Sequence, residues 1–152
     1  MVQWLRDNAL ALVSTAVAAL LSTIAILQSR KRTERRLVTK VSYGFLVFGP
    51  KLSEQHLIVS VANDSLHPVT VRSISLRLPG GCTVIIPPGQ GEFNLPFELA
   101  PGRGGNFWVS IAALSGSLME EGYRGRVKLR SVVGDAVGTE FVSRSIRFDI
   151  KG

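Results

Sequence analysis

The sequence is poor in the residues that bind metals or form disulfides. Its 152 residues include one cysteine, Cys82, and two histidines, His56 and His67. One cysteine excludes an intrachain disulfide, which favours a reducing compartment or a domain that needs no covalent cross-link. Metal sites need several histidines, cysteines or carboxylates close together, and these residues are scattered along this chain. We therefore expect no metal and no other cofactor.

A recognisable catalytic motif is also missing. Asp64, Ser65 and His67 come nearest to a serine-hydrolase triad, but their spacing within one loop does not let a third group orient the base. Residues 102–105 (GRGG) resemble a phosphate-binding loop without its Gly-Lys-Ser/Thr ending and its following helix. We read both histidines as surface residues. These absences predict a protein that is not an enzyme and takes no small-molecule substrate.

Charged residues, Gln, Asn, Gly and Pro are all absent from residues 9–27, ALALVSTAVAALLSTIAIL. At about 1.5 Å per residue, a helix over this run would be roughly 28 Å long, close to the roughly 30 Å hydrocarbon core of a bilayer. We interpret Ala9–Leu27 as a single transmembrane helix within an N-terminal segment, residues 1–29.

A cluster of cations follows this run. It comprises Arg30, Lys31, Arg32, Arg35 and Arg36. The positive-inside rule places this basic linker, residues 30–36, and the domain after it in the cytoplasm, with the N-terminus outside. Trp4 is then expected at the outer interface and the cations on anionic lipid head groups. The sequence thus predicts a single-pass membrane protein whose membrane-surface contacts are Trp4 and these five cations.

Other interpretations of the N-terminal region stay open. A secretory signal peptide needs cations before the apolar run, where only Arg6 stands, offset by Asp7. The helix could instead pack against protein, in an oligomer or beneath a viral shell. The basic run could bind nucleic acid or act as a nuclear signal. Small residues at four-residue spacing also suit self-association of the helix.

From residue 37 to residue 152 the apolar residues recur with a period of two. The runs 41–47, 57–61, 93–99, 107–111, 127–129 and 146–150 show this alternation. Successive side chains of a strand face opposite sides of a sheet, so these runs predict half-buried strands. Turn residues such as Gly49-Pro50 and Asn63–Ser65 separate them. Seven or eight short strands predict an antiparallel β-sandwich over residues 37–152, with a closed barrel as the alternative.

Four local features refine this prediction. The alternation changes phase within Val69–Leu78, which indicates a β-bulge near Arg72-Ser73. Pro96 cannot donate to a ladder, so Phe93–Leu99 should be an edge strand or an irregular extended segment. Ser117–Glu120 fits a capping box and Gly122 a helix stop, which predicts a short helix at 117–121. Cys82 lies in an apolar run and should be buried.

Three turn motifs resemble bacterial immunoglobulin-like modules. Residues 61–71 (VANDSLHPVTV) resemble a region where Asn ends one strand and a Pro-Val pair begins the next. Residues 96–102 (PFELAPG), followed by FWV, resemble an L-x-P-G turn before an apolar strand, and residues 133–138 (VGDAVG) resemble the final hairpin. The layout is similar to that of small uncharacterised membrane-anchored proteins of bacteria and phages with an immunoglobulin-like β-sandwich domain. The resemblance implies the fold and anchoring, and no catalytic or ligand-binding residues.

A cationic stripe is the one distinctive surface feature of the predicted domain. Arg126, Lys128 and Arg130 share a face of one strand, and Arg147 is expected beside them. Such a face suits an acidic partner, although an ordinary solvated sheet face is the alternative. No aromatic residues lie between these cations, which argues against nucleic acid.

Together these features predict a non-enzymatic, membrane-anchored structural or interaction module. Its expected partners are anionic lipid head groups and either a protein partner or a second copy of itself. The alternative is a virion structural protein whose N-terminal helix lies in a membrane or packs under the capsid shell.

Overall fold

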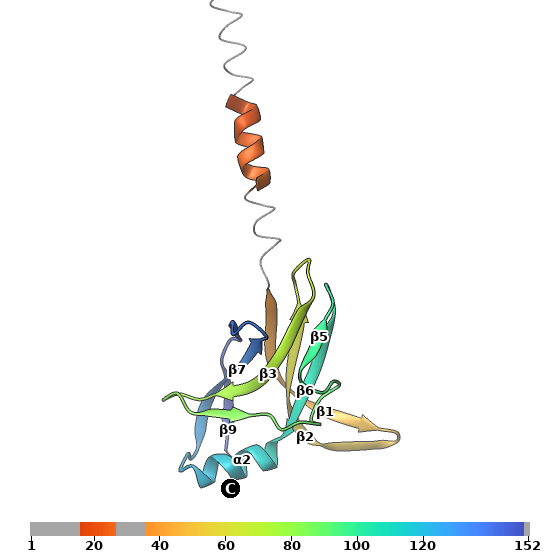
Figure 1. Ribbon diagram of the computed structural model, residues 1–152. Helices are drawn as coiled ribbons and strands as arrows, with labels where there is room; N and C mark the ends of the chain where they lie inside the picture. Colours follow the sequence, from red (N-terminus) through yellow and green to blue (C-terminus); the bar gives the residue numbers. More distant parts are fainter. Residues whose placement is uncertain (1–15, 27–35, 151–152) are drawn as a thin grey trace, which may run out of the picture. The chain divides into compact units, whose positions relative to one another are not determined.

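The computed structural model describes residues 16–26 and 36–150, except for the side chain of residue 48. The chain divides into two compact units, Met1–Glu34 and Arg35–Gly152 (Figure 1). The division falls within the stretch interpreted as a basic linker, residues 30–36.

The described part of the first unit is one short helix. Residues 16–26 are α-helical, which at about 1.5 Å per residue gives a length of roughly 16 Å, against the roughly 30 Å that a bilayer core requires. Among the residues that the structure describes, no helix has the length and apolar content to cross a membrane. The predictions of a transmembrane helix at 9–27 and of a single-pass membrane localisation are therefore wrong. Residues 9–15 and 27 of that run lie outside the described residues.

The second unit contains two antiparallel sheets. The first has the order β1-β2-β6, with β1 at Leu37–Phe48, β2 at Lys51–Asn63 and β6 at Gly104–Ser110. Residues 90–92 extend this sheet beyond β6. Trp108 N donates to Gln90 O and Glu92 N donates to Asn106 O, both at 2.9 Å.

The second sheet is built around β3 and β7. Its order is β4-β3-β7-β8, and in addition β5 pairs with β3 and β9 with β7. The strands are β3 (Val69–Arg77), β4 (Thr83–Ile85), β5 (Phe97–Leu99), β7 (Arg126–Asp135), β8 (Glu140–Val142) and β9 (Ile146–Asp149). The prediction of a mainly β, antiparallel fold is confirmed, and these strands form two sheets and not one closed barrel.

The hydrophobic core takes side chains from both sheets. Leu57 and Val59 of β2 are fully buried in one cluster with Leu76 of β3, Leu129 of β7 and Phe148 of β9. Each strand contributes alternate residues to the core, as the period-two runs predict. The other side chains of each strand point away from the core and form the outer faces of the two sheets.

The predicted bulge in the third strand is present. The pairing of β3 with β7 passes from Val71 opposite Asp135 to Ser73 opposite Gly134, so Arg72 is the extra residue. The bulge lets Val71 and Ile74, which differ in phase, both point into the core, where each is fully buried.

Residues around Pro96 also follow the prediction. The segment before Pro96 is irregular, and only Phe97–Leu99 forms a strand, which pairs with β3. The Phe93 ring stacks on that of Phe97 with centroids 5.0 Å apart. Cys82 is half-buried against the core rather than fully buried.

The one helix described in the second unit, α2 (Ile111–Glu120), begins earlier than predicted. Its N-cap is Ser110, whose hydroxyl accepts a hydrogen bond from Ala113 N at 3.4 Å. Leu114 and Leu118, one turn apart, fix the helix to the core. The helix ends at Glu120, and Gly122, with a φ of +87° that suits glycine, follows as the predicted stop. The predicted start at Ser117 was wrong because Ser110 is the residue that caps the helix.

Candidate functional site

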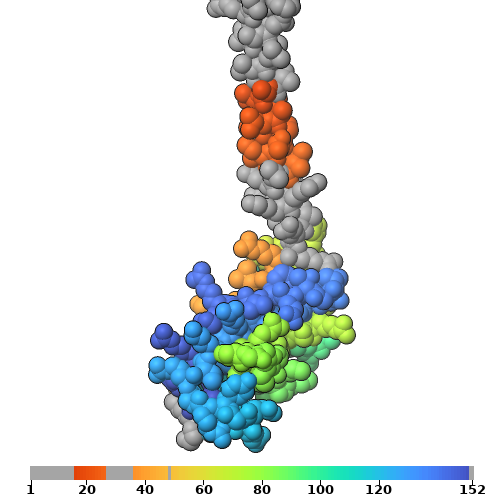
Figure 2. Space-filling model, turned by 90° about the vertical axis from the view of Figure 1, so that its left-hand side faces the viewer, coloured from red at the N-terminus to blue at the C-terminus, as the bar shows by residue number. Residues whose placement is uncertain are grey.

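The outer face of the second sheet is the candidate site. On β7, Leu129 and Ser131 are buried while Arg126, Lys128 and Arg130 are exposed. The core therefore fixes the strand in a register that turns these three cations outward, as predicted. Figure 2 shows the side of the molecule on which blue C-terminal residues and green residues of the β3 region form one surface.

Neighbouring strands add two more cations to this surface. Lys128 lies directly opposite Arg147 of β9, and Arg130 lies directly opposite Arg77 of β3. Residues directly opposite each other in an antiparallel pair project on the same side of the sheet. We call the set Arg77, Lys128, Arg130 and Arg147 the basic face. Three of its members were predicted, and Arg77 was missed because its strand pairing involves residues far apart in sequence.

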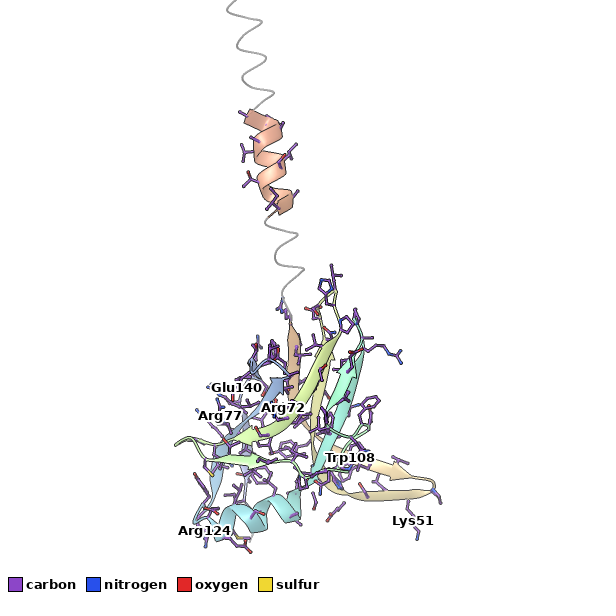
Figure 3. All side chains as sticks on the ribbon, in the orientation of Figure 1. Lys51, Arg72, Arg77, Trp108, Arg124 and Glu140 are labelled. Carbon is purple, nitrogen blue, oxygen red and sulfur yellow. The ribbon has the colours of Figure 1, made fainter. Side chains whose placement is uncertain are left out.

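Two nearby arginines are neutralised by carboxylates. Arg126 Nε lies 2.7 Å from Asp149 Oδ1, and this hydrogen bond and charge raise the pKa of Arg126. Arg77 Nη2 of β3 lies 2.8 Å from Glu140 Oε2 of β8, so this ion pair reaches across β7, the strand between them (Figure 3). Among the described residues, no carboxylate oxygen lies within 4.0 Å of a charged nitrogen of Lys128, Arg130 or Arg147. The basic face thus keeps three positive charges without a paired carboxylate, and Arg126 does not add to them.

Three members of the basic face, Arg77, Lys128 and Arg130, line a groove of about 350 Å³. Leu78 and Pro79 give this groove an apolar part. Cations beside a small apolar surface suit an acidic segment that presents carboxylates together with an aliphatic or aromatic side chain.

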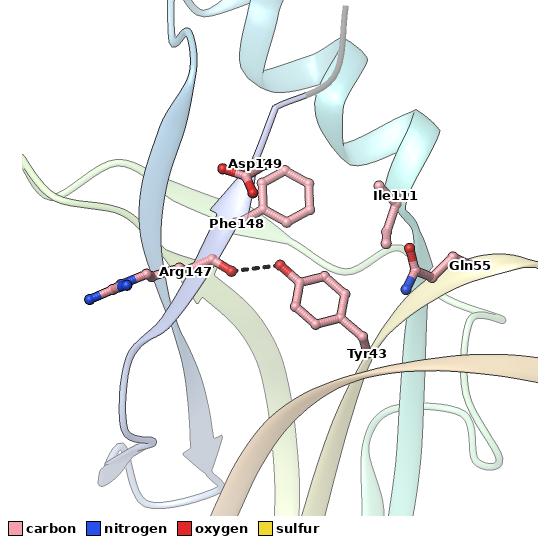
Figure 4. A pocket seen from close by; sticks show the side chains of 6 residues that line it. All are labelled: Tyr43, Gln55, Ile111, Arg147, Phe148 and Asp149. Carbon is pink, nitrogen blue, oxygen red and sulfur yellow. Dashed lines mark hydrogen bonds between the residues drawn. The ribbon is translucent and has the colours of Figure 1, made fainter.

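A second cavity, of about 230 Å³, lies beside β1 and β9 (Figure 4). Tyr43 Oη donates a hydrogen bond of 2.6 Å to the backbone oxygen of Arg147, and this bond joins one sheet to the other. Partial burial and the negative charge of Asp149 raise the pKa of Tyr43, so the phenol stays protonated. Gln55, Ile111 and Phe148 complete the lining. We assign this cavity a structural role, because Tyr43 holds the strand that carries Arg147.

Asp64, Ser65 and His67, the nearest approach to a catalytic triad, lie in a turn that hydrogen bonds hold together. The Ser65 hydroxyl hydrogen-bonds Asn63 Oδ1 (2.7 Å) and His67 O (2.9 Å) rather than the imidazole. The Asn63 amide nitrogen donates to His67 O and Leu99 O, both at 2.8 Å, which fastens this turn to β5. Residues 102–105 lead into β6 and not into a helix. In the described ranges, no three His, Cys, Asp or Glu residues are grouped as metal ligands would be.

Most of the residues predicted to contact a membrane surface lie outside the residues that the structure describes. Trp4, Arg30, Lys31, Arg32 and Arg35 lie outside the described residues. Arg36 is exposed, and its Nε lies 3.8 Å from Asp64 Oδ2, an exposed pair of small energetic value.

No family model matches the chain, and no curated protein sequence matches it. One similar solved structure is a protein from Archaeoglobus fulgidus, at 14% identity and a TM-score of 0.32, over 78% of this chain and 99% of that one. A likeness this weak supports no argument about fold or function.

Proposed function

We propose that this protein is a non-enzymatic interaction module that binds an acidic surface of a partner protein through the basic face. The observation that carries the proposal is the pairing of Lys128 with Arg147, beside Arg130, without a carboxylate within 4.0 Å among the described residues.

The energetics of the sheet support this function. Like charges directly opposite each other on a sheet destabilise it, by an amount within the roughly 0.2–1 kcal/mol that cross-strand pairs contribute. Bound carboxylates would remove the repulsion between Lys128 and Arg147. The strands hold the backbone of these cations in register, so binding would order their side chains but no backbone segment.

We also propose that the fold is an immunoglobulin-like sandwich. The sheet orders β1-β2-β6 and β4-β3-β7-β8 match the orders A-B-E and C′-C-F-G of such folds. The turn motifs at 61–71, 96–102 and 133–138 lie between β2 and β3, around β5 and between β7 and β8, which supports this assignment. Sandwiches of this kind serve many functions, so this assignment adds no activity of its own.

Two matched charge reversals test the proposed function. Lys128→Glu changes the basic face, and Lys51→Glu makes the same change at the turn between β1 and β2 (Figure 3). The probe is a fluorescent deca-glutamate peptide, titrated with the full chain at low salt and followed by anisotropy. We expect Lys128→Glu to weaken binding by about tenfold, which corresponds to a loss of about 1.4 kcal/mol in binding free energy. Lys51→Glu should weaken binding by much less. Equal losses would mean that only net charge matters, and would refute the proposal.

A further inference from the structure

Strand β1 is an open sheet edge. In the described part of the chain it pairs with β2 alone. Asp64 N donates to Arg36 O at 2.9 Å, which continues the ladder by one residue. Residues of an antiparallel strand bond alternately to either side, so the even-numbered residues of β1 bond to β2. The odd-numbered residues, Tyr43 and Phe45 among them, direct their backbone N–H and C=O groups to the open edge.

Half of this strand extends beyond the rest of its sheet. Strand β6 pairs with β2 only over His56–Ala62, so the residues nearer the β1–β2 turn pair only with one another. We call residues 44–55 the arm, and Figure 1 shows it projecting from the sandwich. A two-stranded ribbon without further support is only marginally stable in water.

The arm exposes the continuation of the core face. Along β1, the exposed fraction of the core-facing side chains rises from 4% at Val41 to 43% at Tyr43, 52% at Phe45 and 69% at Val47. Leu52 of β2, opposite Val47, is 65% exposed. The row that is buried inside the sandwich thus continues into solvent, with an open backbone edge beside it.

No charged residue interrupts this edge. The sequence between Lys40 and Lys51 is VSYGFLVFGP, which has no charge and has a proline only in the turn. Exposed edge strands are normally protected from pairing by charges, proline or bulges. Here the register shift lies between Phe45 and Val47, where β1 advances two residues and β2 three, so β1 itself stays regular.

We infer that the arm is a self-association surface, on which β1 of a second copy pairs antiparallel with β1 about a two-fold axis near Phe45. In this register Phe45 faces its own counterpart, and Tyr43 faces Val47 of the other copy. Both copies supply an open edge and an apolar row on the same side of the strand, which an isologous interface requires.

Charge favours a second copy over an acidic partner here. The open edge of β1 is neutral from Val41 to Gly49, whereas the unpaired cations lie on the outer face of the other sheet, on β7 and β9. An acidic partner gains nothing on the neutral edge. Two copies meet there without bringing their basic faces opposite each other, despite a formal net charge of +7 per chain.

The expected contact is small. Four aromatic rings that each offer 150–250 Å² and are about half exposed would bury roughly 300–500 Å². With the valines and leucines added, the total stays below the roughly 1,200 Å² of a standard stable interface. We therefore expect a weak dimer whose population depends on concentration, together with a new backbone ladder.

A register-specific cross-link tests the inference. The full chain is made with Phe45→Cys in a Cys82→Ser background, which leaves one cysteine. Hydrogen-bonded antiparallel pairs place their Cα atoms about 5.5 Å apart, within the roughly 4.4–6.8 Å that a disulfide spans. The control is Ile85→Cys in the same background, since Ile85 is 72% exposed on the short edge strand β4.

We expect the Phe45→Cys chain to form disulfide-linked dimer at least about tenfold faster than the control under mild oxidation at equal micromolar concentration, because pairing raises the effective thiol concentration. Association through any other part of the chain does not favour residue 45 over residue 85. Equal rates, or a faster control, would overturn the inference.

A second measurement avoids cysteine. Phe45→Lys places a charge on the edge at a half-exposed position, and Ile85→Lys is the matched change on β4. In sedimentation of the full chain over a concentration series, Phe45→Lys should lower the weight-average mass relative to wild type, and Ile85→Lys should not. Wild-type masses for Phe45→Lys would contradict the pairing.

Discussion

Lys128 of β7 lies directly opposite Arg147 of β9, and no carboxylate oxygen of the described chain lies within 4.0 Å of either charge. The core fixes both strands, because Leu129 and Phe148, the neighbours of these two cations, are fully buried. The pairing of the two strands therefore keeps these two positive charges opposite each other, where they repel.

Replacing Lys128 with Gln should stabilise the protein. Removing one of two opposed like charges should raise the free energy of unfolding by about 0.2–1 kcal/mol at low salt. The gain should shrink at high salt, where surface charges are screened. Denaturant unfolding of Lys128→Gln and of the control Lys51→Gln measures it. A gain of the same size in the control would show that only net charge matters.

The bond from Tyr43 to Arg147 O should contribute to stability until the phenol ionises. Tyr43→Phe should lower the free energy of unfolding by about 1 kcal/mol at neutral pH, the usual value of a hydrogen bond.

This difference should depend on pH. The pKa of Tyr43 is raised above its usual 10.0 by partial burial first and by Asp149 second. The folded state therefore holds the proton more tightly than the unfolded state, and the contribution is complete below pH 10 and lost as pH rises through the folded pKa. Unfolding of both proteins between pH 8 and 11 tests this. A difference that grows with pH would reverse the assigned sign.

Helix α2 should behave as part of the core. Leu118 is fully buried, so Leu118→Ala should lower the free energy of unfolding by about 2–5 kcal/mol. Leu66 is 61% exposed in a turn, and Leu66→Ala should change it by less than about 0.5 kcal/mol. Chemical denaturation compares the two. Equal small losses would mean that α2 does not contribute to the core.

The extra backbone residue at Arg72 should be required for packing of the core, whereas the Arg72 side chain should not be. Deleting Arg72 shifts either Val71 or Ile74 out of the core, because a one-residue slip turns every side chain to the other face. We expect the protein without residue 72 to lose its cooperative unfolding transition. Arg72→Ala should unfold cooperatively, with a transition close to that of the wild type. Near-ultraviolet circular dichroism during thermal unfolding reports the loss of packing. A well-packed deletion variant would contradict the observed register.

Features encoded by neighbouring residues were predictable from the sequence. The phase change in Val69–Leu78 located the bulge, and Pro96 identified the irregular segment before β5, because each depends on backbone chemistry within a few residues. Lys128 and Arg130 could be placed on one face by the same local alternation.

Features that depend on distant residues were not predictable. Arg77 joins the basic face only because β3 pairs with β7, more than fifty residues away.

Two local patterns in the sequence were also misleading. Helix α2 was missed over its first two turns because Phe107, Val109 and Ile111 continue a strand pattern that the Ser110 cap interrupts. The apolar run 9–27 sets only the maximum length of an apolar helix there. A membrane span was wrongly predicted because this maximum was taken as the length of the helix.

The most direct test of acidic-partner binding at the basic face is a nuclear magnetic resonance titration of the ¹⁵N-labelled full chain with deca-glutamate peptide at low salt. We expect chemical-shift changes to cluster at Arg77, Lys128, Arg130 and Arg147, on the outer face of β3, β7 and β9, and to leave the β1–β2 arm unchanged. Changes spread evenly over all exposed lysines and arginines, or centred on another surface, would contradict it.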